Sequence, residues 1–231
     1  MTHSNEIGPV GAEALHVGLI ESNPAVREAM VSALASRGYR VRTFGSAEDY
    51  LTAESEGRFD CLVLGYRQPG MSSLALQRRL AALPDAPPIV ATSDPTEVPA
   101  AVRLLDGGAI SLVQTPVRPE ELIAVIARAI DWGAVRRRVA SRYAEIGQSV
   151  DRLSPREKTV LQAIVAGQLN KAIAKSLDVS VRTVEGDRAK IVSKFGADTT
   201  GEVVGKYAEY RLLTECSRLI GLAEVEPQEV H

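Results

Sequence analysis

The sequence predicts an α/β domain with a doubly wound, five-stranded parallel sheet, followed by a small all-α domain. Over the first 132 residues, short apolar runs alternate with segments of helical period. The apolar runs then stop, and the rest of the chain carries the spacing and capping residues of short helices. A length of 231 residues is sufficient for two domains that each bury a core.

The alternation predicts that the first domain spans residues 15–132, after a disordered segment at 1–14. A sheet strand is expected in each apolar run, at 15–20, 39–44, 60–65, 87–92 and 109–114. The intervening helices are expected at 25–38, 46–55, 73–83, 97–108 and 118–132. Because a helix follows each strand, the strands are expected to be parallel, with helices covering both faces of the sheet.

A charged, proline-free segment at 133–150 predicts a helical linker. Residues 151–213 then carry four helices, and residues 214–231 are expected to form a C-terminal tail. Ser154 and Glu157 form a capping-box sequence at the start of the first of these helices.

The second and third of these helices are joined by a tight turn at residues 178–180. Ser180 is expected to cap the third helix, and Gly196 to end it. Two short helices in this arrangement predict a helix-turn-helix module.

Composition and spacing narrow the functional classes. The chain is 45% hydrophobic and 24% charged, and it contains no run of the ~20 apolar residues that a membrane-spanning helix requires. We therefore expect a cytoplasmic protein without a membrane partner. Its two cysteines, Cys61 and Cys216, have no metal-ligand spacing, so no metal or cofactor is expected. No P-loop, GxSxG, HExxH or dinucleotide fingerprint occurs, and an enzyme is not expected.

The segment LSPREKTVLQAIVAGQLNKAIAKSLDVSVRTVEGDRAKIVSKFGA carries S-x-R-E, N-K-x-I-A, S-x-R-T-V-E and K-x-G blocks in order. It closely resembles the LuxR-type helix-turn-helix. Placed behind a doubly wound domain, it makes residues 15–220 resemble a response regulator of the FixJ/NarL class. The resemblance implies a bacterial two-component regulator of transcription with a receiver domain and double-stranded DNA as its partner.

Receivers of this family take a phosphoryl group on an aspartate that ends the third strand. Two acidic residues after the first strand hold magnesium, and a hydroxyl residue and a lysine follow the fourth and fifth strands. In this sequence those places hold Gly65, the pair Glu21 and Ser22, Thr92 and Thr115. The acceptor, one acid and the cation are all missing, which predicts a pseudo-receiver that is not phosphorylated on aspartate. An alternative is a shifted register with Asp60 as the acceptor.

On the third helix of the module, Val181, Val184, Ile191, Val192 and Phe195 have the spacing of a core face. The opposite arc is expected to enter the major groove. The residues expected to contact DNA are Lys171, Arg182, Thr183, Glu185, Arg188, Lys190 and Lys194. Residues 151–213 contain eleven basic and eight acidic residues, so their net charge of +3 is a weak signal. Gly186 and Asp187 depart from the family, which has an apolar residue and a histidine there. Asp187 is expected to bring negative charge close to DNA and weaken specificity.

The resemblance also implies a homodimer formed through the last helix. Val203, Val204, Tyr207 and Tyr210 lie along one side of it, a stripe that fits either a dimer interface or the core of the module. The control of such a protein is left open between a small ligand, a partner protein on the receiver-like domain, and abundance. Two functions remain: a phosphorylation-independent transcription regulator, or an adaptor or antagonist whose DNA binding has decayed.

Overall fold

A computed structural model describes residues 14–53, 57–83 and 85–219 of the chain. The chain divides into two compact units between Arg137 and Arg138. Within the described residues, no helix is both long enough and apolar enough to cross a membrane.

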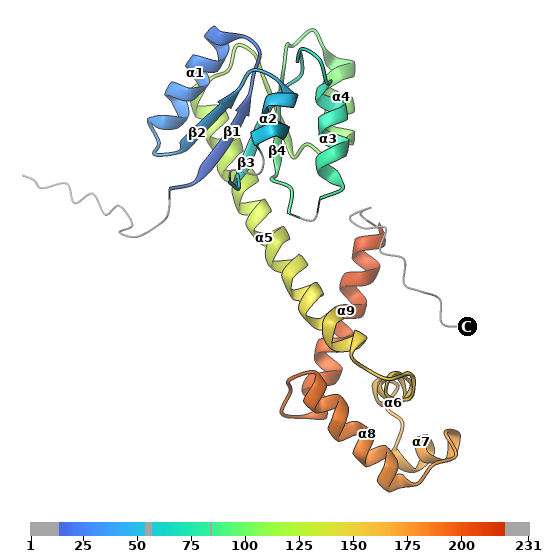
Figure 1. The fold of residues 1–231 in the computed structure, drawn as a ribbon. Helices are drawn as coiled ribbons and strands as arrows, with labels where there is room; N and C mark the ends of the chain where they lie inside the picture. The colour runs from blue at the N-terminus through green and yellow to red at the C-terminus, as the bar shows by residue number, and fades with distance from the viewer. Residues whose placement is uncertain (1–13, 54–56, 84, 220–231) are drawn as a thin grey trace, which may run out of the picture. The chain divides into compact units, whose positions relative to one another are not determined.

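The first unit is the predicted α/β domain (Figure 1). Its strands are β1 (His16–Ile20), β2 (Arg40–Phe44), β3 (Cys61–Gly65), β4 (Ile89–Ser93) and β5 (Ser111–Gln114). Its helices are α1 (Pro24–Ala35), α2 (Ala47–Ala53), α3 (Ser73–Ala81), α4 (Val98–Asp106) and the first part of α5 (Pro119–Asp151). The five strands are all parallel, in the order β2-β1-β3-β4-β5, which confirms the predicted fold.

Successive residues of the central strands point to opposite faces of the sheet, and each face is covered by its own helices. Leu62 and Leu64 of β3 pack in a cluster with residues of α2, α3 and α4. Cys61 and Val63 pack in a second cluster with residues of α1 and α5. A strand buried on both faces reads as a continuous apolar run, which is why these strands were predictable.

The strand register brings the carboxyl ends of the central strands to one edge of the sheet. Gly65 at the end of β3 lies opposite Thr92 of β4, and Ser93 lies opposite Gln114 of β5. Glu21 follows directly after β1, whose last residue, Ile20, pairs with Leu64. In a doubly wound sheet this edge is where ligands bind.

The second unit contains the rest of α5, then α6 (Pro155–Val165), α7 (Asn170–Ser176), α8 (Val181–Lys194) and α9 (Thr200–Leu219). Its core is formed by buried apolar residues of all five helices and their junctions, among them Ile146, Val160, Ile173, Val184, Ile191, Phe195 and Val203. The predicted capping box is present, because Ser154 Oγ accepts from the Glu157 backbone and the Glu157 carboxylate accepts from Ser154 N.

The predicted turn and helix ends of the module are also confirmed. Ser180 Oγ accepts from Thr183 N at 3.0 Å at the start of α8. Asp178 in the turn has a φ of 52°, and Gly196 after α8 has a φ of 54°. Both are left-handed conformations, which aspartate tolerates and glycine favours.

Three boundaries or orientations differ from the expectations. Residues 138–150 of the predicted linker belong to the second unit, where Ile146 of α5 is only 2% exposed. Helix α9 continues to Leu219, so the first residues of the predicted tail are helical, since no glycine or proline interrupts residues 214–219. Val181 was expected in the core but is exposed: it is the first residue of α8, and side chains lean toward a helix N-terminus. Of the disordered segment predicted at 1–14, residues 1–13 lie outside the described residues, as does the end of the predicted tail.

Candidate functional sites: the sheet crevice and the recognition helix

The crevice at the end of β3 is filled by neighbouring side chains. A Cβ atom built on Gly65 would lie 2.7 Å from Glu21 Oε2 and 2.9 Å from Gln68 Nε2. The Gln68 amide donates to the carbonyl of Ile20 at 3.2 Å and to that of Gly65 at 3.1 Å. Gln68 Oε1 is buried without a hydrogen-bond partner. The place expected for an acceptor side chain therefore holds the neutral amide of Gln68. No sequence motif indicated this residue.

The acidic side of the crevice retains one carboxylate. Glu21 is 8% exposed, and its Oε1 accepts from Asn23 N at 2.8 Å. The Ser22 hydroxyl donates to the carbonyl of Arg67 at 3.0 Å. Magnesium prefers carboxylate ligands, and one carboxylate beside a serine and a glycine does not fit the ion that the family uses. Within the described residues, no group of three or more His, Cys, Asp and Glu side chains is arranged to hold a metal.

The cationic side of the crevice holds hydroxyl groups. Thr92 is 2% exposed, and the Thr115 hydroxyl donates to the carbonyl of Ser93 at 3.3 Å. The nearby guanidinium of Arg27 donates to the backbone carbonyl of Glu21 at 2.7 Å. That of Arg67 is paired with Glu97 at 2.6 Å. Both guanidinium groups therefore bind other partners than a group at the acceptor position of Gly65.

Asp60 lies at the opposite end of β3 from Gly65, because it directly precedes Cys61. Its Oδ2 accepts from His16 N at 2.9 Å, at the start of β1. The alternative register that makes Asp60 the acceptor is therefore wrong.

Helix α8 is the helix whose outward arc is expected to enter the major groove. Its outward arc is formed by the exposed residues Arg182, Glu185, Gly186, Ala189, Lys190 and Ser193, as the helical spacing predicted. Lys171, near the start of α7, is also exposed. Thr183 is half-buried beside the Ser180 cap, with 2.8 Å between the two hydroxyl oxygens. Arg188 is half-buried and donates to Asn170 Oδ1 at 3.1 Å.

Lys194 was expected to contact phosphate, but its ammonium group is bound inside the unit. It donates to Glu157 Oε2 at 2.6 Å and to the carbonyl of Arg152 at 2.9 Å. Glu157 is 4% exposed. Its burial raises the pKa, but hydrogen bonds from Lys194 and Ser154 lower it by more, and the net pKa lies below the ordinary value of 4.5. Lys194 therefore neutralises a buried carboxylate, and this role is separate from the phosphate contact that was expected of it.

Asp187 was expected to present negative charge to DNA, and this expectation is wrong. Its side chain is 2% exposed and faces α6. Arg156 Nη2 donates to Asp187 Oδ1 at 3.0 Å, and Arg156 Nε lies 2.8 Å from Oδ2. The second contact is ionic only, because Oδ2 has no hydrogen bond of good geometry. The hydrogen bond and charge of Asp187 raise the pKa of the Arg156 guanidinium.

Both units match known families. Residues 17–127 match the family described as "Response regulator receiver domain", and residues 151–205 match "Bacterial regulatory proteins, luxR family". Response regulator protein TmoT of Ectopseudomonas mendocina is 34% identical over 186 residues, which cover 80% of this chain and 84% of TmoT. The chain belongs to the response regulators. Its LuxR-type domain makes it a DNA-binding transcriptional regulator, in a family of regulators rather than enzymes.

Two further relatives support this family. Transcriptional regulatory protein FixJ of Bradyrhizobium diazoefficiens is 32% identical over 189 residues, which cover 82% of this chain and 92% of FixJ. The solved structure of response regulator StyR superposes with a TM-score of 0.72 at 31% identity, covering 86% of this chain and all of StyR. The similarity to these response regulators therefore extends over both units.

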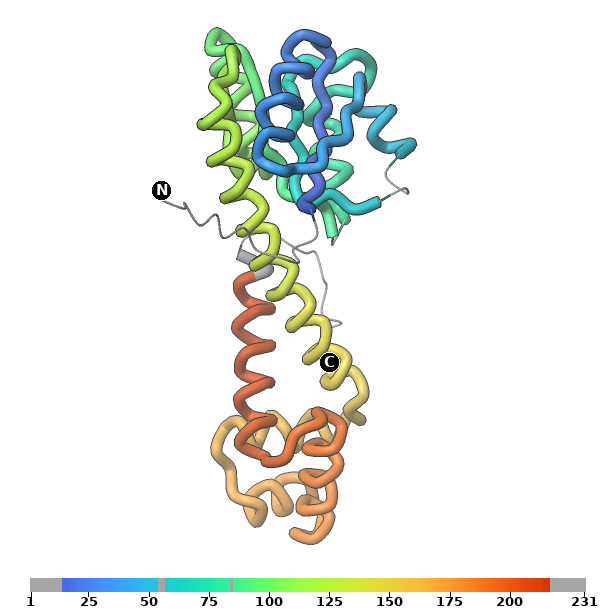
Figure 2. Tube along the Cα trace, turned by 90° about the vertical axis from the view of Figure 1, so that its left-hand side faces the viewer, coloured from blue at the N-terminus to red at the C-terminus, as the bar shows by residue number. Residues whose placement is uncertain are grey.

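The stripe predicted as the dimer interface of this response regulator faces its own unit. Val203 is 1% exposed, and Tyr207 and Tyr210 pack against the same core. The Tyr210 ring stacks on Tyr143 of α5 with 4.9 Å between centroids, and burial together with Tyr143 raises the pKa of Tyr210 to about 12. Figure 2 shows α9 alongside the second half of α5. The core expectation is confirmed for Val203, whereas Val204, Tyr207 and Tyr210 are half-buried, and the dimer interface stays a prediction.

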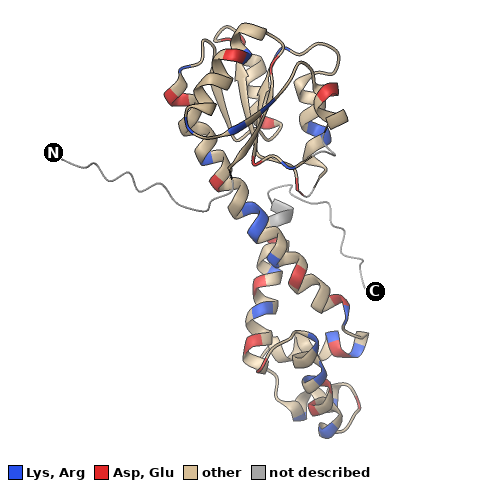
Figure 3. Ribbon diagram, turned by 60° about the vertical axis from the view of Figure 1, so that its left-hand side comes forward, with Lys and Arg blue, Asp and Glu red and all other residues tan. Residues whose placement is uncertain are grey.

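The surface charge of this response regulator's DNA-binding unit is mixed. Figure 3 shows basic and acidic residues interspersed over its helices. This agrees with the small net charge of residues 151–213, and it means that the helix-turn-helix geometry carries more information than the charge does.

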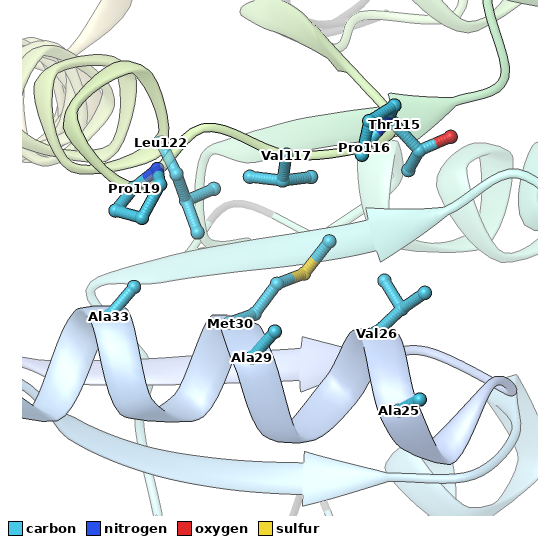
Figure 4. Close-up of a pocket in the computed structure, with 10 residues that line it drawn as sticks. All are labelled: Ala25, Val26, Ala29, Met30, Ala33, Thr115, Pro116, Val117, Pro119 and Leu122. Carbon is cyan, nitrogen blue, oxygen red and sulfur yellow. The ribbon is translucent and has the colours of Figure 1, made fainter.

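A hollow of about 290 Å³ lies between α1 and the segment from the end of β5 to the start of α5. Figure 4 shows its side chains, which are all apolar except that of Thr115. Alanines at positions 25, 29 and 33 of α1 line one side of the hollow, and their small side chains leave this space open. It offers a small apolar surface without a charged or nucleophilic group.

Proposed function

We propose that this response regulator controls transcription without phosphorylation of its receiver on aspartate. The observation that supports this most is the end of β3, where Gly65 carries no nucleophile and the Gln68 amide fills the adjoining space. Phosphoryl transfer to a protein requires a nucleophile in line with phosphorus, and positive charge on the transferred oxygens. Ser22 in place of an acid and Thr115 in place of lysine remove support for the metal ion and for that charge.

The test is intact-mass analysis of the full chain after incubation with acetyl phosphate and magnesium. We expect no phosphoryl adduct, whereas a receiver with an aspartate at this place, treated in parallel, gains one. Gly65→Asp alone is expected to remain unmodified, because the new side chain would meet Glu21 and Gln68 and would still lack a cation. An adduct on any aspartate of the native receiver would overturn the proposal.

The DNA-contacting surface that we propose lies on α8 and the start of α7. Its members are Lys171, Arg182, Thr183, Glu185, Arg188 and Lys190. Arg182 can reach a guanine edge or a phosphate, while Lys171 and Lys190 suit phosphates. The exposed arc of α8 supports this, because the recognition helix of such a module enters the major groove.

DNA binding without phosphorylation is tested by fluorescence anisotropy of the untreated full chain on a pool of genomic fragments. The titration is made at about 50 and 200 mM salt, the range over which phosphate contacts change affinity steeply. Tight, salt-sensitive binding that enriches particular fragments is expected. Absence of binding at both salt concentrations would favour the alternative function, an adaptor or antagonist that binds another regulatory protein.

We further propose that a small ligand, a partner protein on the receiver-like unit, or abundance controls the regulator. The apolar hollow between α1 and α5 supports the first two routes, because it is a concave, uncharged surface close to Thr115. A thermal-shift screen of small apolar compounds, repeated with Ala29→Phe to fill the hollow, tests the ligand route. Stabilisation of the native chain that the variant loses would support it, and no stabilisation would leave partner protein and abundance.

We also propose that the regulator acts as a homodimer, which would match a two-fold symmetric DNA site. Helix α9 supports this, because Val204, Tyr207 and Tyr210 of the predicted stripe are only half-buried and Leu212 on the same helix is 61% exposed. Sedimentation of the full chain with and without a bound fragment tests the assembly. A monomer in both states would contradict it.

A further inference from the structure

Two consecutive residues at the start of α6 are bound to α8 at two points. Arg156 is paired with Asp187, and Glu157 is paired with Lys194. Asp187 and Lys194 are seven residues apart, so they lie two turns apart on the same face of α8. We call these four residues the α6–α8 clamp.

The two ion pairs of the clamp are oriented oppositely: α6 contributes the cation to one pair and the anion to the other. Rotating α8 by one residue, about 100°, would carry Asp187 and Lys194 away from their partners. Reversing the pairing would set Arg156 against Lys194 and Glu157 against Asp187, which like charges disfavour. The clamp therefore fixes both the rotation and the axial position of α8, which decide which residues point outward.

Asp187 is the least exposed member of the clamp. Arg156, Glu157 and Lys194 lie in the S-x-R-E and K-x-G blocks, and Asp187 lies outside both. A carboxylate that is 2% exposed is tolerated only when it is paired. Within the described residues, its charged neighbours are Arg156 and the ammonium of Lys190, which lies 4.0 Å from Oδ1.

We propose that Asp187 is a positioning residue for DNA recognition: through Arg156 it sets the orientation of the outward arc of α8. It does not touch DNA itself. Discrimination between DNA sequences should then depend on Asp187, while binding to phosphates in general should not. This inference rests on the DNA binding described above and deepens it.

The test compares Asp187→Asn with the native full chain. Affinities are measured for a fragment that the native chain enriches from the genomic pool and for a shuffled duplex of the same composition. We expect the ratio of the two affinities to fall by about tenfold, the effect of misaligning one base contact. Affinity for the shuffled duplex should remain equal or rise slightly, because a negative charge is removed.

Asp198→Asn is the matched control, since it removes one carboxylate from an exposed position of the same unit. Its affinity ratio should equal that of the native chain. Arg156→Lys keeps the positive charge but loses the two-pronged guanidinium, and it should lower the ratio as Asp187→Asn does. In the double variant Arg156→Gln/Asp187→Asn, two amides can hydrogen-bond, and the ratio should recover at least in part.

Circular dichroism and thermal melting establish first that each variant is folded. If Asp187→Asn does not fold, the affinity ratio of Arg156→Lys tests the proposal instead. A folded variant that discriminates like the native chain would overturn the proposal. Failure of the native chain to bind any duplex would instead refute DNA binding itself, which is a separate result.

Discussion

The crevice of the receiver unit and the α6–α8 clamp of the DNA-binding unit both carry substitutions away from their family, with different consequences. In the crevice, Gly65, Ser22 and Thr115 carry no charge, and the Gln68 amide lies beside Gly65 with its own Oε1 unpartnered. In the clamp, Asp187 introduces a buried charge, and Arg156 neutralises it. The neutral side chains of the crevice need only to fill space, whereas a buried charge needs a partner with matching geometry.

The two regions also differ in how far the fold depends on their polar residues. The strands around Gly65 remain buried on both faces, so the sheet does not depend on the residues at its edge. In the DNA-binding unit, by contrast, the charged residues are part of the packing itself.

The largest difference between the two regions should appear in stability. Glu157→Ala removes a buried carboxylate, its pairing with Lys194 and half of the capping box. We expect it to lower the free energy of unfolding by about 2–3 kcal/mol, measured by chemical denaturation. Glu21→Ala, which removes a similarly buried carboxylate from the crevice, should cost about 1 kcal/mol or less, because its remaining role is one bond to Asn23 N. Equal losses of unfolding free energy in the two variants would show that the clamp and the crevice do not differ in this respect.

The next effect concerns DNA affinity. Arg182→Ala combined with Lys190→Ala removes two exposed basic residues from the outward arc of α8. The slope of log affinity against log salt should become shallower by about 1.8, or about 0.9 for each lost phosphate contact. Lys158→Ala combined with Lys175→Ala removes the same charge from positions outside the proposed surface and should change the slope less. Equal slopes for the first variant and the native chain would show that α8 does not contact phosphates.

A smaller effect is the pH dependence of the DNA-binding unit. The pKa of Glu157 in the folded chain lies below its ordinary value of 4.5, so the folded state holds the ionised form more strongly than the unfolded state does. Its contribution to stability is therefore complete above the unfolded pKa and is lost as the pH falls through the folded pKa. Glu157→Gln should flatten melting temperature against pH below about 4.5. An unchanged profile would show that folding does not lower the pKa of Glu157.

The sequence predicted the fold and the positions of the crevice residues, because periodicity identifies strands and a doubly wound sheet gathers their ends at one edge. It did not predict Gln68 or the partner of Asp187. Gln68 lies in a turn, where no periodicity indicates which way a side chain points. Arg156 and Asp187 are 31 residues apart on different helices, and only the packing of those helices brings them together. Similarly, the stripe on α9 showed that one face is buried but not what covers it.

The smallest expected effect tests a glycine of the recognition helix. Gly186 lies within α8, and a Cβ atom there would meet nothing within 4 Å. Gly186→Ala should therefore raise the free energy of unfolding by about 1 kcal/mol, because alanine is the better helix former. Since the fold itself gives no reason for a glycine here, the DNA affinity of the variant identifies the reason. Weaker affinity in a more stable variant would show that the glycine allows α8 to approach DNA closely. The outward arc of α8 would then contribute to positioning on DNA, as the clamp does. Unchanged affinity would show that neither the fold nor DNA binding requires a glycine at position 186.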